Sequence, residues 1–118
     1  MPAKLSTHVL DISHGCPAAG MKIELWSLDG DERDLITTVK TNADGRTDTP
    51  LLSADEMKIG RYEIIFFVGD YFAVKSPTLP KVRFLDRVPV RFGIADAGAS
   101  YHVPLLCSPW AYSTYRGT

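Results

Sequence analysis

The sequence predicts an all-β sandwich. Short apolar or alternating segments are separated by proline and glycine at short intervals, a pattern typical of a sandwich or barrel. The chain has 118 residues, 45% of them hydrophobic, so we expect one domain over residues 1–118 with a substantial core. No internal repeat or low-complexity segment interrupts the pattern.

The first half of the chain is expected to contain four strands. Residues 21–28 alternate apolar and polar side chains, which is typical of a half-buried strand. The turn at 14–17 contains Gly and Pro, and the turn Asn42–Gly45 contains residues that tolerate a positive φ. These turns separate the expected strands, which are 5–11, 21–28, 34–41 and a short strand beginning at Arg46.

Four more strands and the only helical segments are expected in the second half. Ser53 and Glu56 have capping-box spacing, but Gly60 leaves room for only a turn or two of helix. Asp70–Lys75 is expected to be the one short helix. Pro89 has no N–H to donate, so its strand belongs at a sheet edge or a bulge. The expected strands are 61–68, 82–84, 87–94 and 101–108.

The charge distribution argues against nucleic-acid and membrane binding. The formal net charge is −1, whereas nucleic-acid binding requires a basic surface. Lys81, Arg83, Arg87 and Arg91 are interleaved with apolar residues, so they are interpreted as the solvated side of strands. No apolar stretch is long enough to span a bilayer, and no apolar signal region follows Met1, so we expect a cytoplasmic protein. Cys16 and Cys107 are expected to be free thiols.

Two of the three histidines have a direction set by strand alternation. His8 shares a face with Ser6 and Leu10, and His102 shares a face with Leu106. Histidine suits proton transfer near neutral pH, and strands position a side chain well. Either histidine alone would be interpreted as a half-buried structural residue. His14 lies in a turn and is assigned no role.

Arg46 and the C-terminus complete the set of candidates. Arg46 directly follows the turn, and its guanidinium can bind carboxylates or amide edges, although a solvated turn arginine would have the same spacing. The aromatic C-terminus is expected to dock, or else to form an ordinary last strand. No nucleophile elbow, phosphate-binding loop or zinc motif is present, and two histidines alone do not predict a metal site. Residue spacing alone therefore predicts a β sandwich with a possible His/Arg site.

Motifs at both ends of the chain carry a resemblance to a known family. The first strand reads Leu5-Ser6-Thr7-His8-Val9-Leu10-Asp11, and the last segment runs from Tyr101-His102-Val103-Pro104 to Tyr115-Arg116-Gly117-Thr118. With Asp44-Gly45-Arg46 and Gly60-x-Tyr62-Glu63 between them, they resemble the 5-hydroxyisourate hydrolases, the transthyretin-related enzymes of purine catabolism. The resemblance covers nearly the whole chain.

The resemblance implies a fold, an assembly and a set of site residues. It implies a transthyretin-like sandwich of two four-stranded sheets with one short helix. It also implies a homotetramer, a dimer of dimers, with active sites at the dimer–dimer interface and no metal or cofactor. The family's catalytic residues fall on His8, Arg46 and His102, and its substrate-binding residues on His8, Arg46, Tyr115 and Thr118. Arg116, Gly117, Leu106 and Ser113 are expected to support them.

The implied reaction is the opening of the six-membered ring of 5-hydroxyisourate by water. The product would be 2-oxo-4-hydroxy-4-carboxy-5-ureidoimidazoline. The histidines would handle protons, and Arg46 would stabilise developing negative charge on the carbonyl oxygen. Thr118 stands where the family usually has serine and keeps the hydroxyl. Relatives can also be periplasmic or peroxisomal, although the last residues here do not match a Ser-Lys-Leu signal.

Two other functions fit the same fold. One is a transthyretin-like carrier that binds an aromatic small molecule in a tetramer channel, because one fold hosts several functions. The polar set His8, Arg46 and His102 argues against a carrier, whose channel would be more apolar. The other is a purely structural sandwich module, which leaves the terminal motifs unexplained.

Overall fold

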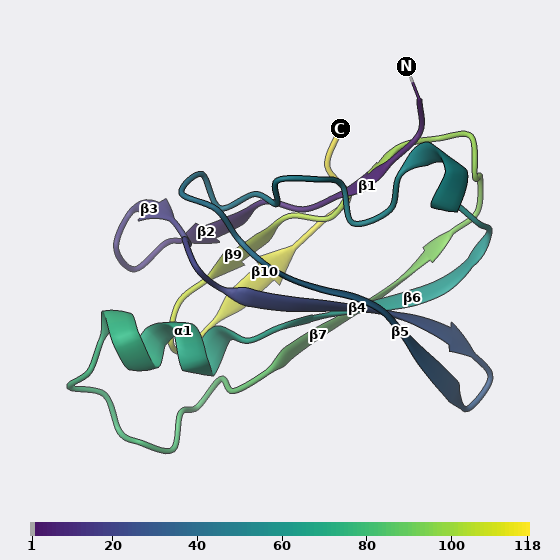
Figure 1. Ribbon diagram of the computed structural model, residues 1–118. Coiled ribbons are helices and arrows are strands. Elements are labelled where there is room, and N and C mark those ends of the chain that lie inside the picture. Colours follow the sequence, from purple (N-terminus) through teal and green to yellow (C-terminus); the bar gives the residue numbers. More distant parts are fainter. Residues whose placement is uncertain (1) are drawn as a thin grey trace.

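Two four-stranded sheets pack face to face in the computed structural model, which describes residues 2–118 (Figure 1). One sheet has the order β10-β9-β2-β3, with β2 Val9–Asp11, β3 Cys16–Pro17, β9 Leu105–Cys107 and β10 Tyr112–Thr114. The other has the order β5-β4-β6-β7, with β4 Lys22–Asp29, β5 Glu32–Lys40, β6 Gly60–Phe66 and β7 Val88–Ile94. The predicted sandwich of two four-stranded sheets with one α-helix is confirmed.

The β5-β4-β6-β7 sheet follows the predicted alternation. Ile23 and Leu25 of β4 are fully buried, whereas Lys22 and Glu24, which alternate with them, are half-buried on the other face. All three strand pairings are antiparallel, and a bulge separates Leu25 from Trp26 in the β4–β5 ladder. Pro89 lies in β7, an edge strand of this sheet, as its missing N–H predicts.

The helices are short, as the sequence predicts. The α-helix α1 covers Val68–Lys75 and begins two residues before the predicted start. The strand β6 therefore ends at Phe66, two residues before its predicted end. A 3₁₀ turn covers Ala54–Glu56, where Glu56 Oε1 accepts a hydrogen bond from Ser53 N at 2.9 Å. Within residues 2–118 neither helix is long and apolar enough to cross a membrane.

Two predicted strands do not form. The segment after Arg46 makes only one isolated bridge, between Leu52 and Leu5, because the backbone of Arg46 is already bonded within the preceding turn. The segment 82–84 lies in the long loop between α1 and β7, with Val82 90% exposed. This segment alternates like a strand but pairs with no other strand. Arg83 Nη1 instead donates a hydrogen bond to Leu79 O at 3.1 Å within the loop.

The two predicted strands that carry His8 and His102 are each broken in the middle. The segment 5–11 divides into β1 (Leu5–Ser6) and β2, and the segment 101–108 divides into β8 (Tyr101–His102) and β9. The two halves pair in parallel and in the same register on both sides of the break, Ser6 with His102 and Val9 with Leu105. Pro104 supplies no N–H at the break, and Thr7 Oγ1 donates to Val103 O there at 2.7 Å.

One hydrophobic core fills the space between the sheets. Its largest fully buried side chains include Phe66 of β6 and Phe72 of α1, together with Leu5 and Leu105 from the opposite sheet region. Leu5 is fully buried one residue before Ser6, so the core fixes the position of β1. The side chains that alternate with buried Leu5 and Tyr101 in the β1–β8 pair are those of Ser6 and His102, and both line a cavity on the outer side of the pair.

Candidate active site

A polar cavity of about 270 Å³ opens where the β1–β8 pair meets the C-terminus and the loop after β5. Both strands of the parallel pair, the loop and the last residue contribute side chains to it. The residues that line it are Lys4, Ser6, Arg46, Ser100, His102 and Thr118. Three of the predicted site residues, far apart in the sequence, therefore share one cavity, and its lining contains no carboxylate side chain.

His102 is held from two sides. Its Nδ1 lies 2.9 Å from the Oγ of Ser6, its cross-strand partner in the parallel β1–β8 pair. The C-terminal segment crosses β8 on the other side, where Gly117 N donates to His102 O at 2.7 Å. A Cβ at position 117 would lie 2.6 Å from the imidazole Cδ2. Only glycine allows the tail to pass this close to the ring.

The surroundings of His102 keep its imidazole neutral. Burial is the largest cause that lowers its pKa below the ordinary value of 6.5, and repulsion from the Arg46 guanidinium, and from the His8 ring in its protonated form, lowers it further. Lys4 makes a smaller contribution in the same direction. His8 thus influences His102, although it does not itself line the cavity. A neutral imidazole can accept a proton at neutral pH.

The turn 42–46 carries one side of the site and fixes His8. His8 Nε2 lies 2.9 Å from Asp44 O. A carbonyl oxygen only accepts hydrogen bonds, so Nε2 carries the hydrogen and Nδ1 of the neutral ring has the free lone pair. Val9 N donates to Gly45 O at 2.8 Å, which attaches the same turn to the break between β1 and β2.

Asn42 determines where Arg46 stands. Its Oδ1 accepts hydrogen bonds from Asp44 N at 2.9 Å and Arg46 N at 3.1 Å, and its backbone N donates to Arg46 O at 2.7 Å. The backbone of Arg46 is thus bonded through both its polar groups. Among residues 2–118 no carboxylate lies within ion-pairing distance of the Arg46 guanidinium, so it can bind a carbonyl or an anion.

Gly45 provides a test of this turn. Its φ is +76°, and a Cβ would overlap the carbonyl oxygen of Val9. We expect Gly45→Ala to lower the free energy of unfolding by about 2 kcal/mol or more, because left-handed strain adds to the clash. Gly30 also has a positive φ, of +61°, but open space around it, so Gly30→Ala is the matched control. Equal destabilisation in urea unfolding would contradict the close contact.

The other predicted tail residues divide into two groups. Arg116 lies over the Tyr101 ring, with Cζ 4.1 Å from the centroid, and Nη2 donates to Ser100 O at 3.3 Å, so it fastens the tail. Tyr115 is 58% exposed and does not line the cavity. Leu106 and Ser113 pair across β9 and β10, also outside it. A single chain does not bring these three residues to His102.

Three lining residues were not among the predicted site residues. Ser6 could have been predicted as a site residue, because strand alternation places it on the same face as His8. No feature of the sequence indicated Lys4 or Ser100, because the two meet only through the parallel pairing of β1 with β8. Ser100 Oγ accepts a hydrogen bond from Lys4 N there. Among residues 2–118 no group of three or more His, Cys, Asp or Glu side chains is placed to hold a metal ion.

Comparisons with known proteins agree on one family. The family model described as "HIUase/Transthyretin family" matches residues 5–117. The protein named 5-hydroxyisourate hydrolase 2 from Rhizobium meliloti is 56% identical over 115 residues, which cover 98% of this chain and 96% of that protein. The hydrolase named 5-hydroxyisourate hydrolase from Pseudomonas aeruginosa is 51% identical, with coverage of 98% and 91%.

Solved structures show the same fold. A structure of Klebsiella pneumoniae 5-hydroxyisourate hydrolase matches with a TM-score of 0.81 and 34% identity, over 98% of this chain and 99% of that one. A crystal structure of (S)-allantoin synthase matches with a TM-score of 0.91 and 45% identity, over 99% of this chain. This chain spans 45% of the length of that synthase chain.

Proposed function

The chain belongs to the HIUase/transthyretin family, and on that basis we propose that it hydrolyses 5-hydroxyisourate in the cavity bounded by His102, Arg46 and Thr118. It is a hydrolase of urate catabolism and not a carrier. The reaction is assigned to this cavity because the neutral imidazole of His102 and the unpaired guanidinium of Arg46 both line it. A polar heterocycle rich in carbonyl and N–H groups suits that lining.

In the proposed reaction, water attacks a ring amide carbonyl and the C–N bond breaks. His102 takes the proton from the water. It can do so if Nδ1–H donates to Ser6 Oγ, which leaves the Nε2 lone pair free. The carbonyl carbon becomes a carboxylate, and the leaving ring nitrogen receives a proton. A positioned acid or base accelerates such a step by about 10²–10⁴-fold.

The remaining residues bind and stabilise. Arg46 donates to the carbonyl oxygen as negative charge develops on it, which is most effective in a site of fixed geometry. His8 orients the water or protonates the leaving nitrogen, with its ring fixed by Asp44 O. Thr118 offers a hydroxyl and the terminal carboxylate, and Tyr115 completes the binding site from a neighbouring chain. Arg116, Gly117, Leu106 and Ser113 support the tail and the β9–β10 surface.

The protonation of His102 can be followed directly. We expect its ring C–H signals to titrate below pH 6.5 in NMR spectra, because burial and the neighbouring positive charges lower its pKa. Arg46→Gln removes one of these charges, so the midpoint should move to higher pH in that variant. The acid limb of kcat/KM should lie below pH 6.5 for the same reason. A wild-type midpoint above 6.5 would contradict the lowered pKa of His102.

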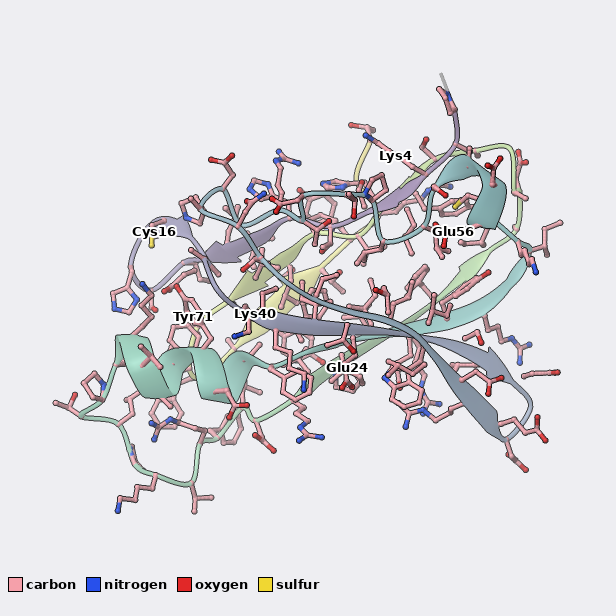
Figure 2. The ribbon with its side chains drawn as sticks, in the orientation of Figure 1. Lys4, Cys16, Glu24, Lys40, Glu56 and Tyr71 are labelled. Atoms are coloured by element: carbon pink, nitrogen blue, oxygen red, sulfur yellow. The ribbon has the colours of Figure 1, made fainter. Side chains whose placement is uncertain are left out.

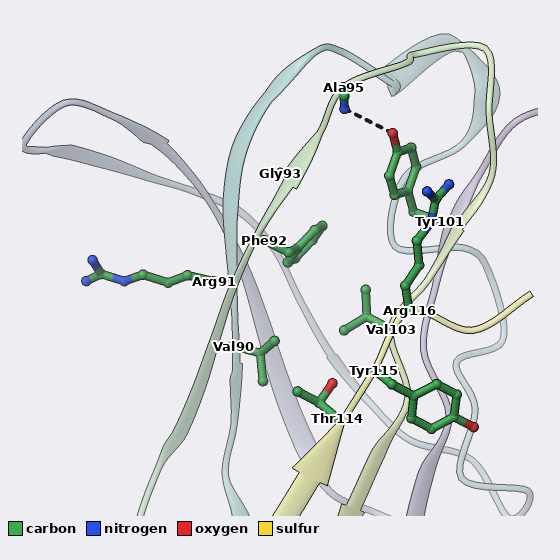
Figure 3. Close-up of a pocket in the computed structure, with 10 residues that line it drawn as sticks. All are labelled: Val90, Arg91, Phe92, Gly93, Ala95, Tyr101, Val103, Thr114, Tyr115 and Arg116. Carbon is green, nitrogen blue, oxygen red and sulfur yellow. Dashed lines mark hydrogen bonds between the residues drawn. The ribbon is translucent and has the colours of Figure 1, made fainter.

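We further propose a homotetramer, a dimer of dimers with the sites at the dimer–dimer interface. The strands β7 and β10 are sheet edges, and edges favour pairing with another chain. Between these edges lies an apolar depression of about 350 Å³ with Val90, Phe92 and Val103 in its wall (Figure 3). Tyr112 on β10 is 45% exposed. Such edges and aromatic surfaces support edge-to-edge association.

Sedimentation tests the assembly. We expect four chains per particle at micromolar concentration, and a smaller, less active particle for Tyr112→Arg, which places a charge on the β10 surface. Ile59→Arg is the control, because Ile59 is 71% exposed and lies outside β7 and β10. A fully active monomeric wild type would contradict the proposal.

The compartment proposed is the cytoplasm. Cys16 is exposed and Cys107 is buried, and the two are not joined by a disulfide. Free thiols fit a reducing compartment. Localisation of a tagged full-length chain in its own host tests this.

Mass spectrometry of the product tests the reaction itself. With the chain present in catalytic amounts, 5-hydroxyisourate should convert into a species heavier by one water before any carbon dioxide is lost. A carrier would leave the substrate unchanged apart from its spontaneous decay. Conversion to an isomer of unchanged mass would contradict hydrolysis.

A further inference from the structure

A second cavity, which we call the α1 groove, lies between α1 and the start of β4 and has a volume of about 410 Å³. One face of the helix forms one wall, at positions spaced by three and four residues. The ends of β4 and β5 form the other wall. The lining of the groove includes Lys22, Lys40, Phe67, Asp70, Tyr71 and Lys75. Figure 2 shows Lys40 and Tyr71 on the α1 side of the molecule and Lys4, from the candidate active site, on the opposite side.

The groove concentrates positive charge in a protein whose net charge is −1. Three lysines line it and only one acid, Asp70. Lys22 and Lys40 are direct cross-strand partners in the β4–β5 ladder. Like charges at such positions destabilise a sheet. Among residues 2–118 the only ion pair of these lysines is a long one, from Lys22 Nζ to Glu24 Oε2 at 3.8 Å.

Two of the ammonium groups are held in place over aromatic rings. Lys22 Nζ lies 4.5 Å from the centroid of the Phe67 ring, and Lys75 Nζ lies 6.0 Å from that of Tyr71. Tyr71 is itself fixed, because its hydroxyl donates to the buried carboxylate of Asp11 at 2.9 Å. Lys22 and Lys75 are therefore held against fixed aromatic rings, and the repulsion between Lys22 and Lys40 is offset only by the long Lys22–Glu24 contact and by Asp70 within the described residues.

We propose that the α1 groove binds a small multivalent oxyanion of the phosphate class, either free phosphate or a phosphate monoester. An anion in the groove would offset the repulsion between Lys22 and Lys40 and accept charge-assisted hydrogen bonds from the lysines that line it. Stacking of a planar ligand is not expected to contribute, because Lys22 and Arg87 already lie over the Phe67 ring, at 4.5 and 4.6 Å. Recognition then rests on the charge of the oxyanion.

The experiment is an NMR titration of ¹⁵N-labelled protein with inorganic phosphate at constant ionic strength, balanced with chloride. Arg46→Gln is used as the background, because Arg46 in the candidate active site is a competing anion-binding group. We expect saturable shifts of the amides of Gly20, Lys22, Lys40 and Asp70–Lys75. A parallel titration with phenyl phosphate identifies the source: equal affinity points to free phosphate, and tighter binding to an ester.

Substitution of single lysines inside and outside the α1 groove tests which of them contribute to phosphate binding. Lys40→Gln and Lys75→Gln should each weaken phosphate binding about tenfold, because a hydrogen bond to a charged group is lost. Lys81→Gln changes the net charge equally but lies outside the groove, so it should leave the affinity unchanged. Shifts that grow linearly without saturation, or that spread over lysines outside the groove, would overturn the proposal. Because hydrolysis is not measured, the result is independent of the proposed catalytic function.

Discussion

Removal of Tyr115–Thr118 is expected to reduce kcat/KM for 5-hydroxyisourate by about 10²–10⁴-fold while the sandwich stays folded. The deletion takes Thr118 out of the cavity and removes the hydrogen bond from Gly117 N to His102 O. It also removes the Arg116 guanidinium from Tyr101. The strand β10 ends at Thr114, so the sheet itself keeps all its strands.

Two single substitutions refine this prediction. Thr118→Ser keeps a hydroxyl and the terminal carboxylate, and should retain most of the activity. Gly117→Ala keeps the whole tail but drives a Cβ into the His102 ring, so it should lower kcat with little change in the melting temperature. Far-UV circular dichroism and thermal unfolding check the fold in each case. A truncated protein with wild-type turnover would show that the tail is only structural.

His102→Ala is expected to lower kcat by about 10²–10⁴-fold. The substitution removes the only group in the cavity lining that combines a free ring nitrogen with a pKa lowered by burial and by Arg46. KM should change much less, because Arg46 and Thr118 still bind the substrate. Steady-state kinetics at several substrate concentrations separates the two constants.

His14→Gln is the control for this variant. His14 is the third histidine, and its Nδ1 lies 2.7 Å from Asp11 Oδ2 beside α1, outside the cavity. Its replacement should leave kcat unchanged even if it lowers the melting temperature. A His102→Ala enzyme as fast as the His14→Gln enzyme would remove His102 from the mechanism.

The parts of the fold that follow from local periodicity could be predicted. Alternation in 21–28 places Ile23 and Leu25 in the core, and the residues of the turn 42–45 correctly end a strand before Arg46. Alternation also places Ser6 and His8 on one face. The family motif then identified His102, Arg46 and Thr118, which the structure brings to one cavity.

The parts that depend on long-range pairing could not be predicted. The break in the first strand is set by the parallel partner segment around Pro104, about a hundred residues away, and a parallel pair leaves no mark in either segment alone. Lys4 and Ser100 enter the cavity for the same reason. The segment 82–84 shows the converse, because its alternation is that of a strand but it pairs with no strand of either sheet.

The place of Tyr115 illustrates a further limit. The family motif groups Tyr115 with Thr118, yet within one chain the tyrosine is exposed and lies outside the cavity that Thr118 lines. Neither sequence spacing nor the geometry of a single chain unites them. In the proposed tetramer, Tyr115 acts at an interface.

Hydrolysis is tested most simply by the decay of 5-hydroxyisourate, generated in the cuvette from urate by urate oxidase. The purified chain is added at a small fraction of the substrate concentration, and the absorbance of the intermediate is followed against its spontaneous loss. We expect many turnovers per chain with the wild type and a rate near the blank with His102→Ala. If the intermediate decays no faster with folded wild-type protein than in the blank, the chain is not a 5-hydroxyisourate hydrolase.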